Sequence, residues 1–269
     1  MQVQSRSTLR VIITGASSGL GQALAKAYAA RYQTHLTLGL VGRNREALLT
    51  LQSLLTSSHG CQVDMYVADV RDAAAMQIVA EDFLAAHGTP HIVIANAGVS
   101  RGTLTECQED IDAFQAVFDT NVMGLVHTFQ PFIAAMKRSG AQGQQVQLVG
   151  IASVAGIRGL PGSGAYSASK AAAITYLESL RVEMQLFGIQ VTTIAPGYIR
   201  TPMTDINTYP MPFLMDADVF AKKALCAIAN GKRFTIIPWQ MGIVARIMRM
   251  IPAPLWDAIM KKAPHKARL

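Results

Sequence analysis

The stretch that decides the fold reads Thr14-Gly15-Ala16-Ser17-Ser18-Gly19-Leu20-Gly21. It follows an apolar run at 9–14, and it leads into residues 20–32, whose apolar side chains recur at helical spacing. Glycines permit a tight turn, a close approach of the backbone to a ligand, and close packing of a helix on a strand. The stretch therefore predicts a strand, a glycine-rich turn and a helix in immediate succession.

The same alternation continues along the chain. After the first strand at 9–14, apolar β-branched runs predict strands at 35–41, 62–67, 91–95, 146–151, 189–194 and 234–237. Helical spacing predicts helices at 20–32, 45–57, 73–87, 110–137, 163–187 and 216–230, the long one disturbed at Pro131. Such alternation indicates an α/β fold of βαβ units, with a parallel sheet between two layers of helices. We expect one domain at 1–237 and a helical C-terminal extension at 238–269.

The glycine turn has a second consequence. The helix that follows it offers free N–H groups and the positive end of its dipole to an anion. A glycine pattern alone also occurs in ordinary turns, but the order of strand, turn and helix is the one that a dinucleotide phosphate requires. We therefore interpret residues 15–21 as the phosphate-binding turn of a dinucleotide site.

A second group of residues carries acid–base chemistry. Tyr166 and Lys170 are four residues apart on a predicted helix, so their side chains share a face. An ammonium beside a phenol favours the phenolate and would lower the pKa of Tyr166 from its usual value of about 10. Ser153 follows the predicted strand at 146–151 and could hold a substrate oxygen by a hydrogen bond.

In this order, the motifs resemble those of the short-chain dehydrogenase/reductase family, over about residues 8–237. The match comprises the glycine turn, Ala95-Asn96-Ala97-Gly98, Asn121 after Thr120, Ser153 with Tyr166 and Lys170, and Pro196-Gly197-Tyr198-Ile199-Arg200-Thr201. Ala95 departs from the pattern, since the family has Asn there. The departure puts a local contact of the sheet in doubt more than the chemistry.

The resemblance implies a Rossmann-type, doubly wound sheet of about seven strands and hydride transfer between a nicotinamide and a carbonyl or alcohol. It implies that Tyr166 moves the proton, Lys170 holds the nicotinamide ribose, Ser153 orients the carbonyl, and Asn121 holds a water of a proton relay. The residues implied for cofactor contact are Gly15, Ser17, Ser18, Gly19, Leu20, Gly21, Arg43, Asp69, Val70, Asn96, Ala97, Gly98, Tyr166, Lys170, Pro196, Gly197, Ile199 and Thr201. No metal is expected.

Two residues at the end of the second strand bear on the choice of cofactor. NAD sites place a carboxylate there, whereas an Arg accommodates the 2′-phosphate of NADP. Gly42 occupies the carboxylate position and Arg43 follows it, which favours NADP(H); Ser18 is not the second basic residue of some NADP-dependent relatives. A solvated charge is the alternative for Arg43. Asp69 is either a contact to adenine or a helix N-cap.

Residues 201–216 would cover the substrate. They include Met203, Ile206, Tyr209, Met211, Phe213, Leu214 and Met215. Such a lid favours a hydrophobic carbonyl or alcohol, although these residues could also simply pack the lid onto the domain. Residues 156–164 would form the opposite wall.

Charge is concentrated at the C-terminus. Residues 232–269 hold eight Lys or Arg against Asp257 alone, whereas the first 231 residues hold sixteen charges of each sign, within a total of +7. A neutral main domain argues against nucleic acid as a partner. The tail reads MGIVARIMRM at 241–250, is broken by Pro252 and Pro254, and resumes at 255–260. Two explanations remain open: the tail packs on the domain or on a second subunit, or it lies on an anionic membrane as a basic amphipathic helix.

The remaining features concern location, assembly and alternatives. The polar start at 1–10 has no apolar signal stretch, and Cys61, Cys107 and Cys226 form no motif, which fits a reducing cytoplasm. The long helices at 110–137 and 163–187 resemble those through which the family pairs, so we expect a homodimer or tetramer.

An NAD-dependent alcohol dehydrogenase is an alternative function. A nucleotide-sensing regulator on the same fold is another, although such proteins commonly lose part of the catalytic set that is complete here.

Overall fold

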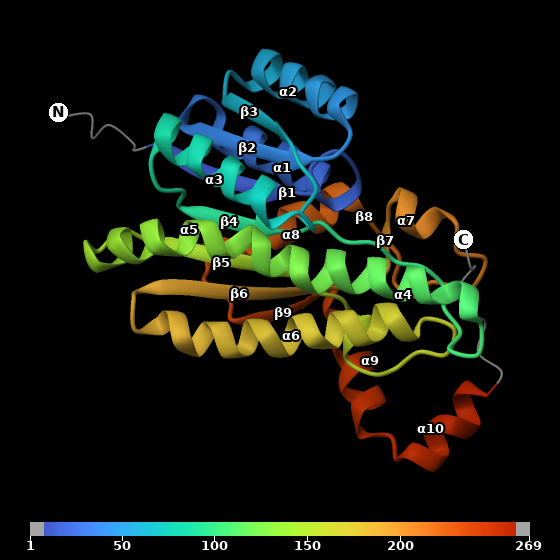
Figure 1. Ribbon diagram of the computed structural model, residues 1–269. Coiled ribbons are helices and arrows are strands. Elements are labelled where there is room, and N and C mark those ends of the chain that lie inside the picture. The colour runs from blue at the N-terminus through green and yellow to red at the C-terminus, as the bar shows by residue number, and fades with distance from the viewer. Residues whose placement is uncertain (1–7, 262–269) are drawn as a thin grey trace.

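The computed structural model describes residues 8–261 and contains a seven-stranded parallel sheet (Figure 1). Its strands, in chain order, are β1 (Leu9–Thr14), β2 (Leu36–Gly42), β3 (Gln62–Val67), β4 (Ile92–Ala95), β5 (Val146–Ile151), β6 (Ile189–Pro196) and β9 (Phe234–Ile237). They lie in the order β3-β2-β1-β4-β5-β6-β9, and every neighbouring pair is parallel. The predicted α/β, Rossmann-type fold is confirmed. The basic residues Lys262, Lys266 and Arg268 lie outside the described residues.

Helices cover both faces of the sheet. One core forms beneath α1 (Gly19–Tyr32), α2 (Arg45–His59) and α8 (Ala217–Ala229), and the other beneath α3 (Ala73–His87), α5 (Gly124–Ala141) and α6 (Gly164–Gln185). Successive residues of β1 alternate between the two cores: Ile12 belongs to one and Ile13 to the other, and both are fully buried. A strand that is buried on both faces needs a continuous run of apolar residues, and such runs are what predicted the strands from the sequence.

The sheet has a topological switch point between β1 and β4. The chain runs outward from β1 to β2 and β3, then returns to the other side of β1 to form β4, β5 and β6. The connections on the two sides of this point diverge, and ligands of such folds bind in the crevice that opens there, at the carboxyl ends of the strands. The glycine turn leaves β1 at this edge.

The prediction of one continuous helix over 110–137 is wrong. The segment consists of α4 (Ile111–Phe118), a π-helical turn η3 (Asp119–Met123) and α5, and α5 continues through Pro131. The interruption lies at Asn121, whose side chain bonds the backbone of Val99, so a tertiary contact at Asn121 accompanies the break. Single π turns inside helices are frequent at functional sites.

Several short elements were not predicted. They are η1 (Gln33–His35), η2 (Gln108–Asp110), η4 (Val154–Gly156), α7 (Pro202–Asp205), and the two-stranded sheet of β7 (Ile199–Arg200) and β8 (Met215–Asp216). The C-terminal helices are α9 (Trp239–Met250) and α10 (Ala253–Met260). Pro254 does not break α10, because it lies in the first turn, where its missing N–H has no intrahelical acceptor to lose.

Gly21 provides a test of the packing at the switch point. A Cβ added at Gly21 would lie 2.2 Å from the carbonyl oxygen of Gly15, a backbone atom that cannot rotate away. We expect Gly21→Ala to lower the free energy of unfolding by about 3 kcal/mol in denaturant titrations. Gly159→Ala is the matched control, since its Cβ would meet no atom within 4 Å. Equal stability of the two variants would contradict the tight packing described.

Candidate active site

The glycine turn is held against the end of β4 by a short set of contacts. A Cβ at Gly15, whose φ is +66°, would lie 2.8 Å from the Cα of Ala97. Asn96 Nδ2 donates to the carbonyl oxygen of Thr14 at 2.9 Å, and the backbone N–H of Asn96 donates to Thr14 Oγ1 at 3.1 Å. Ala95 stands where the family has Asn, which put a contact of the sheet in doubt. Here Asn96 and Thr14 make the contact between the ends of β4 and β1.

A cavity of about 330 Å³ opens beside this turn, at the carboxyl ends of the strands. Every residue proposed from sequence for cofactor contact lines it except Gly21, which lies behind the turn and packs on Gly15. Gly42 and Met203, which the sequence also singled out, line it as well, together with Pro202 and Thr204 of the predicted lid. Sequence reasoning missed the remaining lining residues: Asn44, Ala68, Val99, Thr120, Ile151 and Ala152. Several of these end a strand or directly follow one, so the rule that parallel sheets bind ligands at their carboxyl ends could have found them.

One wall of the cavity suits an anion. The helix α1 begins there without an acidic residue in its first turn, and the side chain of its N-cap residue, Ser18, makes no hydrogen bond to the helix. Ser18, Gly19 and Leu20 all line the cavity. Unpaired donors at a helix N-terminus bind phosphates well, so this wall fits the pyrophosphate of a dinucleotide.

Ser153, Tyr166 and Lys170 meet at the inner end of the same cavity. Ser153 Oγ accepts a hydrogen bond from the N–H of Ala155, and the Ser153 side chain also bonds the Tyr166 phenol. Lys170 Nζ donates to the carbonyl oxygen of Ile151 at 3.0 Å and lies 5.9 Å from the centre of the Tyr166 ring. The loop after β5 and the helix α6 thus bring a hydroxyl, a phenol and an amine together, as the sequence predicted.

Burial sets the protonation of this group. Burial raises the pKa of Tyr166, and the hydrogen bond with Ser153 offsets this only in part. The direction is opposite to the lowering expected from Lys170, and it is set by desolvation of the phenolate. Desolvation also lowers the pKa of Lys170 to about 8, since the residue is only 5% exposed.

Asn121 does not line the cavity, although it adjoins the group of Ser153, Tyr166 and Lys170. Its Oδ1 accepts from the N–H of Val99 at 2.8 Å, and its Nδ2 donates to the Val99 carbonyl and to Ser169 Oγ, each at 2.9 Å. A Cβ at Gly98 would lie 3.1 Å from Asn121 Oδ1 and 3.4 Å from Lys170 Nζ. The side chain of Asn121 therefore holds the loop after β4 against α6.

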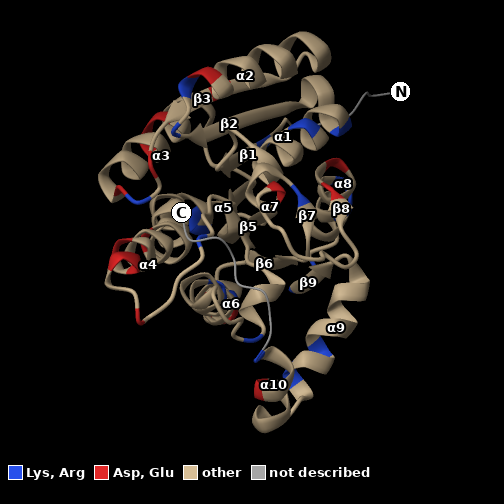
Figure 2. Ribbon diagram, turned by 90° about the vertical axis from the view of Figure 1, so that its right-hand side faces the viewer, with Lys and Arg blue, Asp and Glu red and all other residues tan. Residues whose placement is uncertain are grey.

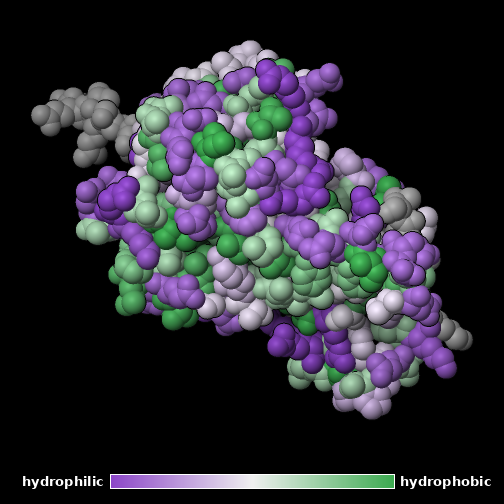
Figure 3. Space-filling model, in the orientation of Figure 1, coloured by the Kyte–Doolittle hydropathy of each residue, from purple (hydrophilic) through white to green (hydrophobic). Residues whose placement is uncertain are grey.

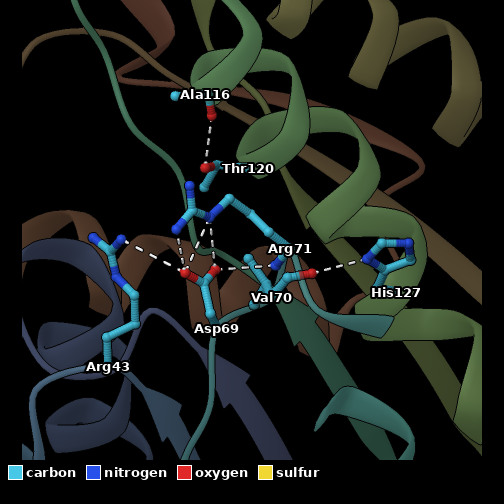
Figure 4. A network of polar contacts seen from close by, with 7 residues as sticks. All are labelled: Arg43, Asp69, Val70, Arg71, Ala116, Thr120 and His127. Atoms are coloured by element: carbon cyan, nitrogen blue, oxygen red, sulfur yellow. Dashed lines mark hydrogen bonds and ion pairs between the residues drawn. The ribbon is translucent and has the colours of Figure 1, made fainter. Parts of the chain in front are cut away.

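Two charged residues that line the cavity, Arg43 and Asp69, form a cluster with Arg71 (Figure 4). Asp69 accepts hydrogen bonds from the Arg71 guanidinium at 2.7–3.1 Å, and its carboxylate lies 3.7 Å from Arg43 Nη1. The bonds from Arg71 lower the pKa of Asp69. The N-cap of α3 is Asp72 and not Asp69, so the alternative of a helix cap for Asp69 is wrong. Arg71 was not foreseen, because no local pattern links it to the cavity.

Comparison with known proteins agrees with this geometry. A family model described as short chain dehydrogenase matches residues 10–209. The chain belongs to the short-chain dehydrogenase family. Membership makes it an NAD(P)-dependent oxidoreductase, in accord with the glycine turn and with the group formed by Ser153, Tyr166 and Lys170.

Individual members of the family are similar over nearly the whole chain. A protein of Myxococcus xanthus described as an uncharacterized oxidoreductase is 36% identical over 253 residues, which are 93% of this chain and 96% of that protein. Dehydrogenase/reductase SDR family member 7B of Bos taurus is 36% identical over 278 residues, covering 96% and 82% respectively. Among solved structures, a short-chain dehydrogenase from Sphingobium yanoikuyae in complex with NADPH has a TM-score of 0.75 and 26% identity, covering 91% of this chain and 97% of that one.

The buried amine predicts a distinctive dependence of stability on pH. Unfolded Lys170 keeps its proton up to its ordinary pKa of 10.5, whereas the folded protein releases it near pH 8. The unfolded state binds more protons between these values, so Lys170 makes stability rise with pH in that window. Relative to Lys170→Met, the free energy of unfolding of the unsubstituted protein should rise by about 3 kcal/mol across it, in denaturant titrations without cofactor. If the free energy of unfolding depended on pH in the same way in both proteins, the lowered pKa of Lys170 would be contradicted.

Proposed function

We propose that the protein is an NADP(H)-dependent carbonyl reductase or alcohol dehydrogenase acting on hydrophobic substrates. The observation that carries this proposal is the cavity with two different ends. One end holds the Tyr166 phenol with the buried Ser153 hydroxyl and Lys170 amine, and the other holds Arg43, with Gly42 in place of a carboxylate. Family membership supports the nicotinamide chemistry, and the residues of the cavity support its finer assignment.

The residues present fit such a cofactor. The start of α1 would hold the pyrophosphate, and Lys170 would hold ribose hydroxyls. Gly15 and Gly98 keep the backbone close, since a Cβ at Gly98 would lie 3.4 Å from Lys170 Nζ. A nicotinamide nucleotide supplies or accepts the hydride when it is bound.

The proton is assigned to Tyr166. Its raised pKa keeps the phenol protonated near neutrality, which suits a general acid that protonates the oxygen of a carbonyl during reduction. Ser153 would orient that oxygen by a hydrogen bond. Lys170, with a pKa of about 8, can exchange protons near physiological pH and so return one to Tyr166. We propose that Asn121 supports this relay by positioning the segment around Gly98 and, as the family resemblance implies, by holding a water.

The charged cluster supports NADP(H) over NAD(H). A free carboxylate beside the adenosine ribose would repel a 2′-phosphate, but Asp69 is held by Arg71, so the cluster of Arg43, Asp69 and Arg71 carries one net positive charge. Arg43 is 66% exposed and available to an additional anion. A guanidinium suits phosphate because its N–H groups form a planar fork.

The lid supports a hydrophobic substrate. Met203 lines the cavity, while Ile206 and Phe213 remain 43% and 50% exposed. Tyr209 of the lid lies 6.4 Å, ring centre to ring centre, from Tyr198, and burial raises its pKa. Because Ile206 and Phe213 are not buried against the domain, their side chains are available to contact an apolar substrate.

Assembly and location complete the proposal. Hydrophobic residues gather over α5 and α6 in the view of Figure 3. We propose that this face forms a homodimer or tetramer, which light scattering at micromolar concentration would detect as a multiple of 28.9 kDa. No helix within residues 8–261 is long and apolar enough to cross a bilayer. We propose a cytoplasmic enzyme whose C-terminal helices can contact a membrane.

Tyr166→Phe tests the chemistry. The substitution removes the proton donor and leaves the ring, so turnover should fall about 10²- to 10⁴-fold while the affinity for NADPH is retained. The measurement is NADPH oxidation with a panel of ketones and aldehydes, together with cofactor titration by thermal shift. Substantial residual turnover would assign the proton to another group. Tight binding of NADPH by the unsubstituted protein without turnover on any compound, including alcohols with NADP⁺, would instead indicate a nucleotide-sensing regulator.

Arg43→Ala tests the cofactor assignment. Loss of a charge-assisted hydrogen bond should weaken NADPH roughly 10- to 150-fold and leave NADH almost unchanged, as measured by calorimetric titration. Arg45→Ala is the matched control, because Arg45 is an exposed neighbour at the start of α2 that does not line the cavity. An equal effect of Arg43→Ala on both cofactors would contradict NADP(H) preference.

A further inference from the structure

The C-terminal arm, α9 with α10, projects from the carboxyl edge of the sheet (Figure 2). It begins directly after β9, whose last residue, Ile237, pairs with Pro196 at the edge where the cavity opens. Figure 2 shows Arg on α9, and Lys261 directly follows α10. In α10 none of the side chains is fully buried. The arm is therefore largely exposed to solvent.

One face of α9 packs on the domain. Met241 and Ala245 are only 4% and 3% exposed. Met241 lies against Gly197, since a Cβ there would be 2.7 Å from Met241 Cγ, and Gly197 lines the cavity. The packing expected for the tail is thus present, but it involves only part of its apolar surface.

The opposite face carries a second apolar row. We name as the α9 ridge Trp239, Ile243, Ile247 and Met250, which are 67%, 46%, 56% and 81% exposed. Their spacing of four, four and three residues aligns them along one side of the helix. Leu255 and Ile259 of α10, four residues apart, are also exposed, at 54% and 53%. An exposed row of this length with a tryptophan at one end requires an explanation in terms of a partner.

Cations border the ridge. Arg246 and Arg249 are exposed, stand three residues apart, and precede Ile247 and Met250 directly. Lys261 follows α10, and Asp257 is the one acidic residue between 239 and 261. An apolar row beside basic side chains and an aromatic anchor is the arrangement of helices that lie in the interface of an anionic bilayer. A two-fold contact between identical ridges would instead bring these arginines close to their own copies.

We propose that the α9 ridge docks on an anionic membrane surface. The apolar side chains enter the interfacial region, while Arg246 and Arg249 contact lipid phosphates. Docking would bring the carboxyl edge of the sheet, where the cavity opens, toward the bilayer. An apolar substrate could then pass from the lipid to the lid, a consequence that rests on the proposed function, whereas the docking itself does not.

The arm is also connected to the catalytic loop. The Arg158 guanidinium donates to the carbonyl oxygen of Ile251 at 2.6 Å and to that of Met248, and it stacks 4.4 Å from the centre of the Trp256 ring. Arg158 lies two residues after η4, for which Ser153 is the N-cap. The bend between α9 and α10 is thereby fixed to the segment that carries Ser153, so the ridge keeps a defined orientation relative to the active site.

Co-sedimentation of the full chain with phosphatidylcholine vesicles, with and without phosphatidylglycerol, tests the docking. Binding should require phosphatidylglycerol and weaken with salt. Arg246→Glu combined with Arg249→Glu should weaken it about 30-fold or more, and Ile247→Glu about tenfold. The matched controls are Lys222→Glu combined with Lys223→Glu on α8, both exposed, and Ile78→Glu on α3, which is 58% exposed against 56% for Ile247. Both controls should bind as the unsubstituted chain does.

Tryptophan fluorescence gives an independent readout. Both tryptophans of the chain, Trp239 and Trp256, lie in the arm. In a Trp256→Phe variant the remaining emission comes from Trp239, and it should shift to the blue on anionic vesicles alone. An unmoved spectrum together with full recovery in the supernatant would overturn the proposal.

Two further measurements keep the result unambiguous. Light scattering on Ile247→Glu would overturn membrane docking if the substitution dissociated an oligomer and left vesicle binding intact, since the ridge would then join copies of the chain. Turnover without vesicles is measured separately on water-soluble carbonyls. Failure there with intact vesicle binding would refute the proposed enzymatic function and leave the docking in place.

Discussion

The close approach of the glycine turn to the end of β4 is the constraint on which the rest of the site depends. At Gly15 and Gly21 an added Cβ would collide with backbone, so no other residue permits the same approach. Thr14 and Asn96 then bond the two strands together at this point. Because this contact lies at the switch point of the sheet, it determines where the first helix begins and where the cavity can open.

The two ends of the cavity differ in how far their ionisable side chains are shielded from solvent. At the inner end, burial raises the pKa of Tyr166 and lowers that of Lys170, so both side chains favour their neutral forms compared with water. At the outer end, the Arg43 and Asp69 side chains are partly exposed and form an ion-pair cluster with Arg71. Proton transfer benefits from the first environment, and recognition of a phosphate benefits from the second.

The C-terminal arm links this chemistry to the surface of the molecule. Its inner face contacts Gly197 at the cavity through Met241, and Arg158 fastens its bend to the loop that carries Ser153. Its outer face presents apolar and basic side chains together. One helix therefore combines a structural face with a candidate interaction face, which is how the two sequence-based explanations for the tail can both apply to it.

Sequence alone determined the seven strands of the main sheet, their parallel arrangement and the candidate residues, because buried parallel strands need continuous apolar runs and because the glycine, tyrosine and lysine motifs are local patterns. Tertiary structure decided what depends on distant partners. The π turn at Asn121 accompanies bonds to Val99, more than twenty positions away in the chain. The pKa of Tyr166 follows from burial rather than from its spacing to Lys170. Arg71 joins the charged cluster because the turn after β3 brings it to Asp69 beside Arg43. Periodicity could not show which apolar residues of α9 are buried, because the helix is apolar on several sides. The packing of Met241 on Gly197 shows which side contacts the domain.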